Sequence, residues 1–287
     1  MAYPVVNSPY GLVAVNEFGG LVYAGSTRMY PIATGYSANL FNGQTVKLSN
    51  GTVIADNYSS ASSPTTPSAG TIGVFVGCQY VNSMSQTIQS QYWPANTVSD
   101  NAIAYIIDDP RTVFKSAVTG QGTSLSNAAN TTIGYVNPAF VGTNMYTLTG
   151  NSGSTTNGNS YLALTGGAVT NGTGNTRVTA AAPWRVVGVV PETAVVVSAV
   201  ASTSGSSTTL TLAAANSSIL AGMQVIAAGT GAAQGNYITV TNVNSTTLTV
   251  SSAITVASGT TCSFIGFPEV LVTWNGNFHS MNNTTGV

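Results

Sequence analysis

The sequence predicts an all-β protein: a partly open β-barrel or sandwich that carries a small inserted β-domain. Gly and Pro recur every few residues, and Thr, Val, Ile and Tyr fill the intervals, which is typical of short strands joined by turns. Glu, Lys, Gln and Leu are too sparse to predict a long helix. Hydrophobic residues make up 43% of the chain and the net charge is −1, a composition that supports a sizeable core and excludes a disordered chain.

Two short apolar runs in the first half of the chain predict strands that are buried on both faces. One is Gly-Val-Phe-Val-Gly at 73–77, and the other is Ala-Ile-Ala-Tyr-Ile-Ile at 102–107. The sequence Asp108-Asp109-Pro110 follows and predicts a turn with surface charge, because Asp bonds its own downstream backbone and Pro fixes φ. The Ser/Pro/Thr-rich segment 56–71 lacks apolar periodicity and predicts a surface loop.

A later stretch rich in Ser, Thr and Ala alternates apolar and polar residues. The runs 209–212, 238–241 and 247–250 each predict a strand with one buried face. The motif Ser-Thr-Thr-Leu-Thr occurs at 207–211 and again 38 residues later at 245–249, which indicates two similar hairpin halves of one small β-domain. Between the two copies, residues 216–221 allow a single helical turn, with Asn as its N-cap and Gly closing it.

The flanks of this stretch predict where the inserted domain begins and ends. Compact strand signals lie at 184–193 and 267–274, and both differ in composition from the residues between them. We therefore expect a core β-domain at 1–193, to which 266–287 returns, and an inserted small β-domain at 194–265.

Charged residues make up only 5% of the chain: six basic and seven acidic side chains, with one His. Acid–base, metal and phosphate chemistry draws mostly on those side chains, so the composition predicts a structural or binding protein and not an enzyme. The scattered basic residues form no basic face, which argues against nucleic-acid binding. No segment has the roughly 18 consecutive apolar residues that a membrane helix needs, and the N-terminus shows no signal peptide.

Few residues are candidates for catalysis or metal binding. His279 lies after the last strand signal, where we expect a polar residue in a tail. Adjacent Asp108 and Asp109 are poorly placed as a catalytic carboxylate pair, since neighbouring residues of an extended chain point to opposite faces. With Asp100 they offer a Ca²⁺ site only as an alternative to a plain turn. The spacings that typically ligate transition metals are absent, and we expect no cofactor.

The two cysteines are expected to be structural. Cys78 and Cys262 are far apart in sequence, and we expect two small buried hydrophobes without a disulfide.

Five residues are candidates for partner binding. Three of them, Tyr3, Pro4 and Tyr10, lie in an N-terminal arm suited to docking on a neighbouring subunit. The other two, Tyr92 and Trp93, are either partner anchors or core residues, because Trp and Tyr dominate interface hot spots but also fill cores.

The chain carries a series of short motifs that contain Gly or aromatic residues, most of them in its N-terminal half. They are Ser-Pro-Tyr-Gly-Leu (8–12), Gly-Gly (19–20), Ala-Gly-Ser-Thr-Arg (24–28), Ile-Ala-Thr-Gly-Tyr (32–36), Gly-Gln-Thr-Val-Lys (43–47), Gly-Cys-Gln-Tyr (77–80), Gln-Tyr-Trp-Pro (91–94), Ala-Tyr-Ile-Ile-Asp-Asp-Pro (104–110) and Trp-Arg-Val-Val (184–187). These motifs resemble a family of virion structural proteins from tailed bacteriophages. The resemblance covers most of 8–115 together with 184–190 and 267–275, and none of its motifs is catalytic.

The predicted insert resembles a small β-module of phage structural proteins, through its two Ser-Thr-Thr-Leu-Thr copies and Leu-Ala-Gly-Met at 220–223. The resemblance implies a capsid decoration or cement protein on the surface of the virion. Its partners would be the major capsid protein and copies of itself, in a homo-oligomer. The alternative is a tail or fibre adhesin that binds host-surface glycans. A glycan-cleaving enzyme is a third reading, and it requires two carboxylates that face each other across a cleft.

Overall fold

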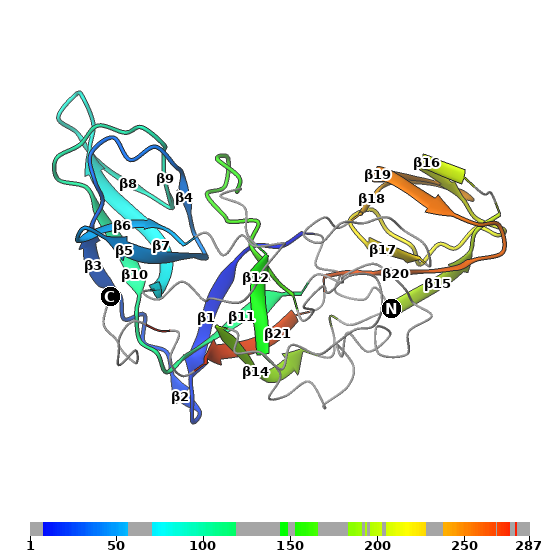
Figure 1. Cartoon of the computed structure of the whole chain (residues 1–287), viewed down its shortest axis with the longest axis horizontal. Helices are drawn as coiled ribbons and strands as arrows, with labels where there is room; N and C mark the ends of the chain where they lie inside the picture. Colours follow the sequence, from blue (N-terminus) through cyan, green and yellow to red (C-terminus); the bar gives the residue numbers. More distant parts are fainter. Residues whose placement is uncertain are drawn as a thin grey trace.

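The computed structural model describes residues 8–56, 71–118, 144–148, 153–165, 183–190, 193, 196–202, 205–227, 238–267, 269–275 and 279. It confirms the all-β prediction, since these residues form antiparallel sheets and contain no α-helix. None of the sheets closes into a barrel. Figure 1 shows three parts side by side: a central sheet in the middle, a second sheet at the left, and the predicted insert at the right.

The central sheet has seven strands, in the order β13-β12-β14-β21-β11-β1-β2. The strands are β1 (Leu12–Glu17), β2 (Leu21–Val22), β11 (Thr112–Ala117), β12 (Asn144–Leu148), β13 (Ala163–Thr165), β14 (Trp184–Val190) and β21 (Glu269–Trp274). The strand β21 pairs with β14 on one side and with β11 on the other. The predicted return of the chain after the insert is therefore a strand in the middle of this sheet.

The second sheet has the order β3-β10-β7-β5-β6, with β8 added to β7. Its strands are β3 (Arg28–Pro31), β5 (Gln44–Ser49), β6 (Thr52–Ala55), β7 (Thr71–Val81), β8 (Thr87–Ser90) and β10 (Ile103–Ile107). The short strands β4 (Leu40–Phe41) and β9 (Tyr92–Trp93) form a separate pair. The apolar runs at 73–77 and 102–107 lie in β7 and β10, and most of β7 is buried as predicted.

The central sheet and the second sheet share one hydrophobic cluster. Trp184 packs on Trp274 with ring centroids 4.0 Å apart, and the Phe114 ring meets Trp184 edge-on at 5.6 Å. Val74 of β7 and Ile107 of β10 join this cluster from the second sheet. The two sheets are thus held together by a common core, in the manner of an open sandwich.

Residues 196–265 form two three-stranded sheets, β15-β20-β17 and β16-β19-β18. The strands are β15 (Val196–Val200), β16 (Gly205–Thr211), β17 (Gln224–Ala227), β18 (Val240–Asn244), β19 (Thr247–Val256) and β20 (Thr261–Ile265). Their buried residues make a cluster drawn entirely from positions 201–264. This part therefore has its own core, while the domain boundaries at 194 and 265 stay a prediction.

The two copies of the repeat are neighbours in one sheet. Strands β16 and β19 run antiparallel, with Leu210 paired to the equivalent Leu248, Thr209 to Thr249 and Thr211 to Thr247. Both Leu side chains are buried. The copies are thus related by a local two-fold axis near the Leu210–Leu248 pair.

The predicted helical turn at 216–221 is absent, and the predicted loop at 56–71 lies mostly outside the described residues. Residues 216–221 form turns and no helix: Asn216 Oδ1 accepts a hydrogen bond from Ser218 N at 3.0 Å, so this side chain bonds the turn rather than capping a helix. The predicted loop at 56–71 lies outside the described residues except at its two ends. Gly153 packs against Phe41, since a Cβ at this position would come within 2.4 Å of that ring.

Candidate functional site

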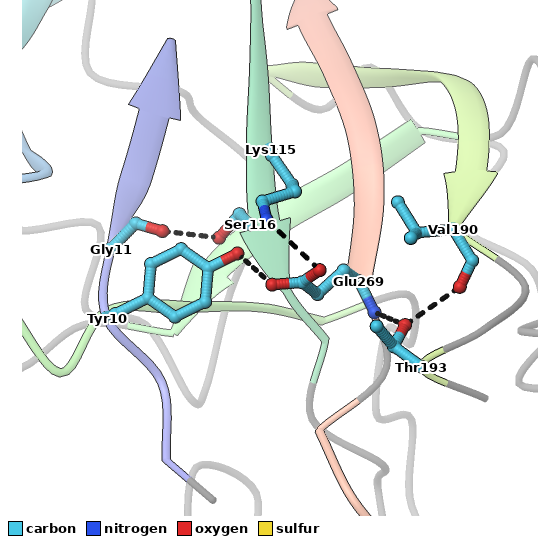
Figure 2. A network of polar contacts seen from close by, with 7 residues as sticks. All are labelled: Tyr10, Gly11, Lys115, Ser116, Val190, Thr193 and Glu269. Carbon is cyan, nitrogen blue, oxygen red and sulfur yellow. Dashed lines mark hydrogen bonds and ion pairs between the residues drawn. The ribbon is translucent and has the colours of Figure 1, made fainter. Parts of the chain in front are cut away.

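A network centred on Glu269 joins three strands of the central sheet (Figure 2). The Glu269 carboxylate accepts a hydrogen bond from the Tyr10 hydroxyl, and its other oxygen lies 3.3 Å from Lys115 Nζ. Lys115 Nζ also lies 5.9 Å from the centroid of the Tyr10 ring. Glu269 is only 7% exposed, so its charge is balanced by Lys115 and by the hydroxyl donor. Burial, and then the neighbouring carboxylate, raise the pKa of Tyr10, which keeps this hydroxyl a donor.

The same network lies where the chain leaves the central sheet and returns to it. Val190, at the end of β14, pairs directly with Glu269, at the start of β21. Thr193 bridges the two strands, because its hydroxyl accepts a hydrogen bond from Glu269 N and donates one to the Val190 carbonyl, each at 2.8 Å. We call Tyr10, Lys115, Val190, Thr193 and Glu269 the root network. Its groups hold backbone and charge in place.

The predicted turn at Asp108–Pro110 is present, but the prediction of a surface charge at Asp108 is wrong. Asp109 Oδ1 accepts a hydrogen bond from Arg111 N at 2.8 Å, which is the turn contact expected of Asp. Asp108 is only 8% exposed, lies 3.1 Å from the Arg28 guanidinium, and accepts a 2.8 Å hydrogen bond from the Tyr30 hydroxyl. The two carboxylates therefore have different structural partners.

A third buried carboxylate, Asp56, lies at the edge of the predicted surface loop. It is 1% exposed and accepts a hydrogen bond from the Thr71 hydroxyl, at the other end of that loop. Burial raises the pKa of Asp56 to about 6, although the Thr71 hydrogen bond and the charge of Lys47 both act to lower it. The side chain thus closes the base of the loop at the cost of burying a carboxyl group.

The expectation of a tail position for His279 is wrong. His279 is fully buried, forms a β-bridge with Thr71, and meets the Trp274 ring edge-on with centroids 5.1 Å apart. Burial lowers the pKa of His279. Among the described residues no three His, Cys, Asp or Glu side chains gather as metal ligands, and Asp100 is exposed in a turn.

Of the five residues predicted for partner binding, the structure describes three, Tyr10, Tyr92 and Trp93. Tyr3 and Pro4 lie outside the described residues. Tyr10 belongs to the root network, so its ring and hydroxyl are engaged inside the fold rather than offered by an arm.

Tyr92 and Trp93 also have internal contacts. Trp93 is fully buried, with Tyr80 edge-on at 5.4 Å, so the core alternative holds for Trp93 and it offers no surface to a partner. Tyr92 is half-buried and stacks on Phe41 at 5.8 Å.

Both cysteines are free and buried, as predicted. Cys78 lies in the core of the second sheet, and Cys262 in the core of the 201–264 cluster. Burial raises the pKa of Cys78 to about 12 and that of Cys262 to about 11, so neither thiol is reactive at neutral pH.

A surface that sequence reasoning did not identify lies on the hairpin of β1 and β2. Val13 and Val15 are each 46% exposed on β1, and Phe18, Leu21 and Val22 at the turn and on β2 are 56%, 55% and 83% exposed. We call these five residues the apolar hairpin. A signal for it was available, because Gly19-Gly20 between two apolar runs is a hairpin pattern.

A shallow hollow of about 250 Å³ lies between β16 and β19 in the predicted insert. Hydroxyl side chains such as Ser206 and Thr209 line it, together with Leu210 and Ile254, and no aromatic residue does. Ligand pockets are typically at least about 300 Å³ and rich in aromatic side chains, so this hollow is a poor ligand site.

Comparisons with protein-family models, with curated proteins and with solved structures give no match to this chain. Within the described ranges, no helix is long and apolar enough to span a membrane.

Proposed function

We propose that this chain is a structural virion protein: a capsid decoration or cement protein that stabilises a tailed-phage head by bridging its capsid subunits. Its partners are the major capsid protein and further copies of itself, and its place is the capsid surface. The observation that supports a structural, subunit-bridging role is the apolar hairpin, because exposed apolar side chains that gather on one element are typical of contact sites. The assignment to a phage particle is supported by the resemblance of the motifs at 8–115, 184–190 and 267–275.

The distribution of charge also supports a role in assembly. Three of the seven acidic side chains, Asp56, Asp108 and Glu269, are buried and connect distant segments within the fold. The four other acidic side chains are the only ones that the chain can place on its exterior, and Ser, Thr and Asn side chains hydrogen-bond a partner without the large cost of desolvating ions. If many linked copies bind one particle, their individually weak contacts act together and give firm attachment through multivalency.

The test compares particles that carry the protein with particles stripped of it. Stripped particles should rupture at a lower temperature, and adding the purified protein back should restore the rupture temperature. Serum albumin added at the same concentration controls for non-specific protection. If intact and stripped particles rupture alike, the cement role is wrong.

The alternative role, a glycan-binding tail adhesin, would place its site in the predicted insert. The hollow between β16 and β19 is small and has no aromatic lining, so it is a poor candidate for that glycan site. Antibody labelling of intact particles separates the two roles: label over the head supports decoration, and label confined to the tail supports adhesion.

A further inference from the structure

The apolar hairpin lies at an open sheet edge. Strand β2 is the last strand of the central sheet, and in the described structure no further strand pairs with its outer side. It protrudes at the lower end of the molecule in Figure 1, away from the other sheets. An open edge offers unpaired N–H and C=O groups, and here it is accompanied by exposed Leu21 and Val22 side chains.

The edge strand β2 is only two residues long, which limits pairing, but among the described residues the edge lacks the other usual protections against pairing with another chain. Natural edge strands are protected by charged side chains, by Pro, or by a covering loop or helix. The segment 18–27 reads Phe-Gly-Gly-Leu-Val-Tyr-Ala-Gly-Ser-Thr and contains neither a charged residue nor Pro. Except for Tyr23, every residue of this segment is exposed. The edge thus has the composition of a contact surface.

We propose that the occupant of this edge is a second copy of the same chain, with the two β2 strands paired antiparallel across a two-fold axis. The pairing extends the central sheet from one copy into the other and buries Leu21 and Val22 of both. It names the self-contact of the proposed decoration protein and rests on that function for its biological setting, although the contact itself is measured on the purified chain.

Two arguments favour a second copy over a different partner. An isologous pairing satisfies the open edge of both copies at once, whereas adding an unrelated strand leaves a new edge exposed. Like charges that face each other across a two-fold axis oppose self-association, and the uncharged segment 18–27 brings none together. The net charge of −1 on the chain adds almost no long-range repulsion between copies.

The first test is sedimentation of the full chain over a hundredfold range of concentration, with one Lys placed at the edge. Val22→Lys should raise the dimer dissociation constant about tenfold or more, since it puts two like charges at the axis. Val98→Lys is the matched control, because Val98 is 77% exposed and lies outside the hairpin. Both side chains are exposed in the single chain, so both variants should keep the wild-type melting temperature at a concentration at which the wild-type protein is monomeric.

The second test uses the burial of both native thiols. Leu21→Cys or Val22→Cys introduces the one accessible thiol among the cysteines of the chain, since Cys78 and Cys262 are both buried. Under mild oxidation these variants should form a covalent dimer. The proposed pairing of the two β2 strands brings the introduced cysteines close together, and a disulfide needs Cα atoms about 4.4–6.8 Å apart. Val98→Cys should remain monomeric under the same conditions.

A wild-type protein that stays monomeric throughout, or a dimer that Val22→Lys leaves intact, overturns the proposal. If the protein is monomeric and Val22→Lys instead abolishes its binding to stripped particles, the hairpin contacts the capsid protein, and the decoration role survives. If the hairpin dimer forms but does not change the rupture temperature of particles, the decoration role fails and the contact stands.

Discussion

Replacing Asp56 with Asn should stabilise the protein at neutral pH. The carboxyl group is buried, and its pKa rises from an ordinary value of 3.8 to about 6. Because the folded-state pKa is raised, the protonated form stabilises the fold at low pH, and this stability is lost as the pH rises from about 4 through 6. The shift corresponds to about 3 kcal/mol, at about 1.4 kcal/mol per unit, so Asp56→Asn should recover up to that amount above pH 7.

The assay is calorimetric unfolding of the wild-type protein and Asp56→Asn at pH 3.5 and at pH 7.5. The variant should melt several degrees higher at pH 7.5, and the difference should nearly vanish at pH 3.5, where both side chains are neutral. Asp100→Asn is the matched control, because Asp100 is exposed and should change neither temperature. A variant that is less stable at pH 7.5 would show that attraction to Lys47 outweighs the burial of the charge, and would refute the reasoning.

Three further predictions concern the root network, the repeat and the thiols. Tyr10→Phe should lower the free energy of unfolding by about 1–3 kcal/mol in urea titrations, because the buried Glu269 carboxylate loses a donor. Leu248→Ala should cost about 2–5 kcal/mol by the same measurement, because this fully buried side chain leaves a cavity. The thiols of Cys78 and Cys262 should not react with Ellman's reagent at pH 8 in the native protein, and both should react in urea.

Each of these predictions has an internal comparison. Tyr161 is 44% exposed, so Tyr161→Phe should leave stability nearly unchanged, and an equal loss for Tyr10→Phe and Tyr161→Phe would contradict the role of the root network. Leu220 is 46% exposed, and Leu220→Ala should cost far less than Leu248→Ala. A thiol that reacts in the native protein would contradict the burial of its cysteine.

The strands were the most predictable part of the fold, because their signal is local. The alternation at 209–212 and 247–250 gives one buried and one exposed face, and the structure buries Leu210, Leu212, Leu248 and Val250. That the two repeats would pair with each other was not predicted, because antiparallel register depends on how the chain turns between them.

The roles of the charged side chains were the least predictable part, because they depend on long-range contacts. Tyr10 and Glu269 are separated by 259 positions, and nothing in their neighbourhoods indicates the pairing. Asp108 looked like a surface residue because its neighbours form a turn, yet Arg28 and Tyr30 of an adjacent strand cover it. His279 looked like part of a tail because the last strand ends before it, and only the fold places it against Trp274.

The chain leaves the central sheet after Val190 and re-enters it at Glu269, and these two residues pair with each other. This arrangement has a mechanical consequence. A force that pulls residues 196–265 away from the central sheet acts on both points together and peels β14 from β21 one hydrogen bond at a time. Peeling meets less resistance than sliding two strands past each other, because the bonds break singly. The two hydrogen bonds of Thr193 lie at the end of the pair where this force acts, so we expect them to break early and to contribute to the load at which residues 196–265 begin to detach.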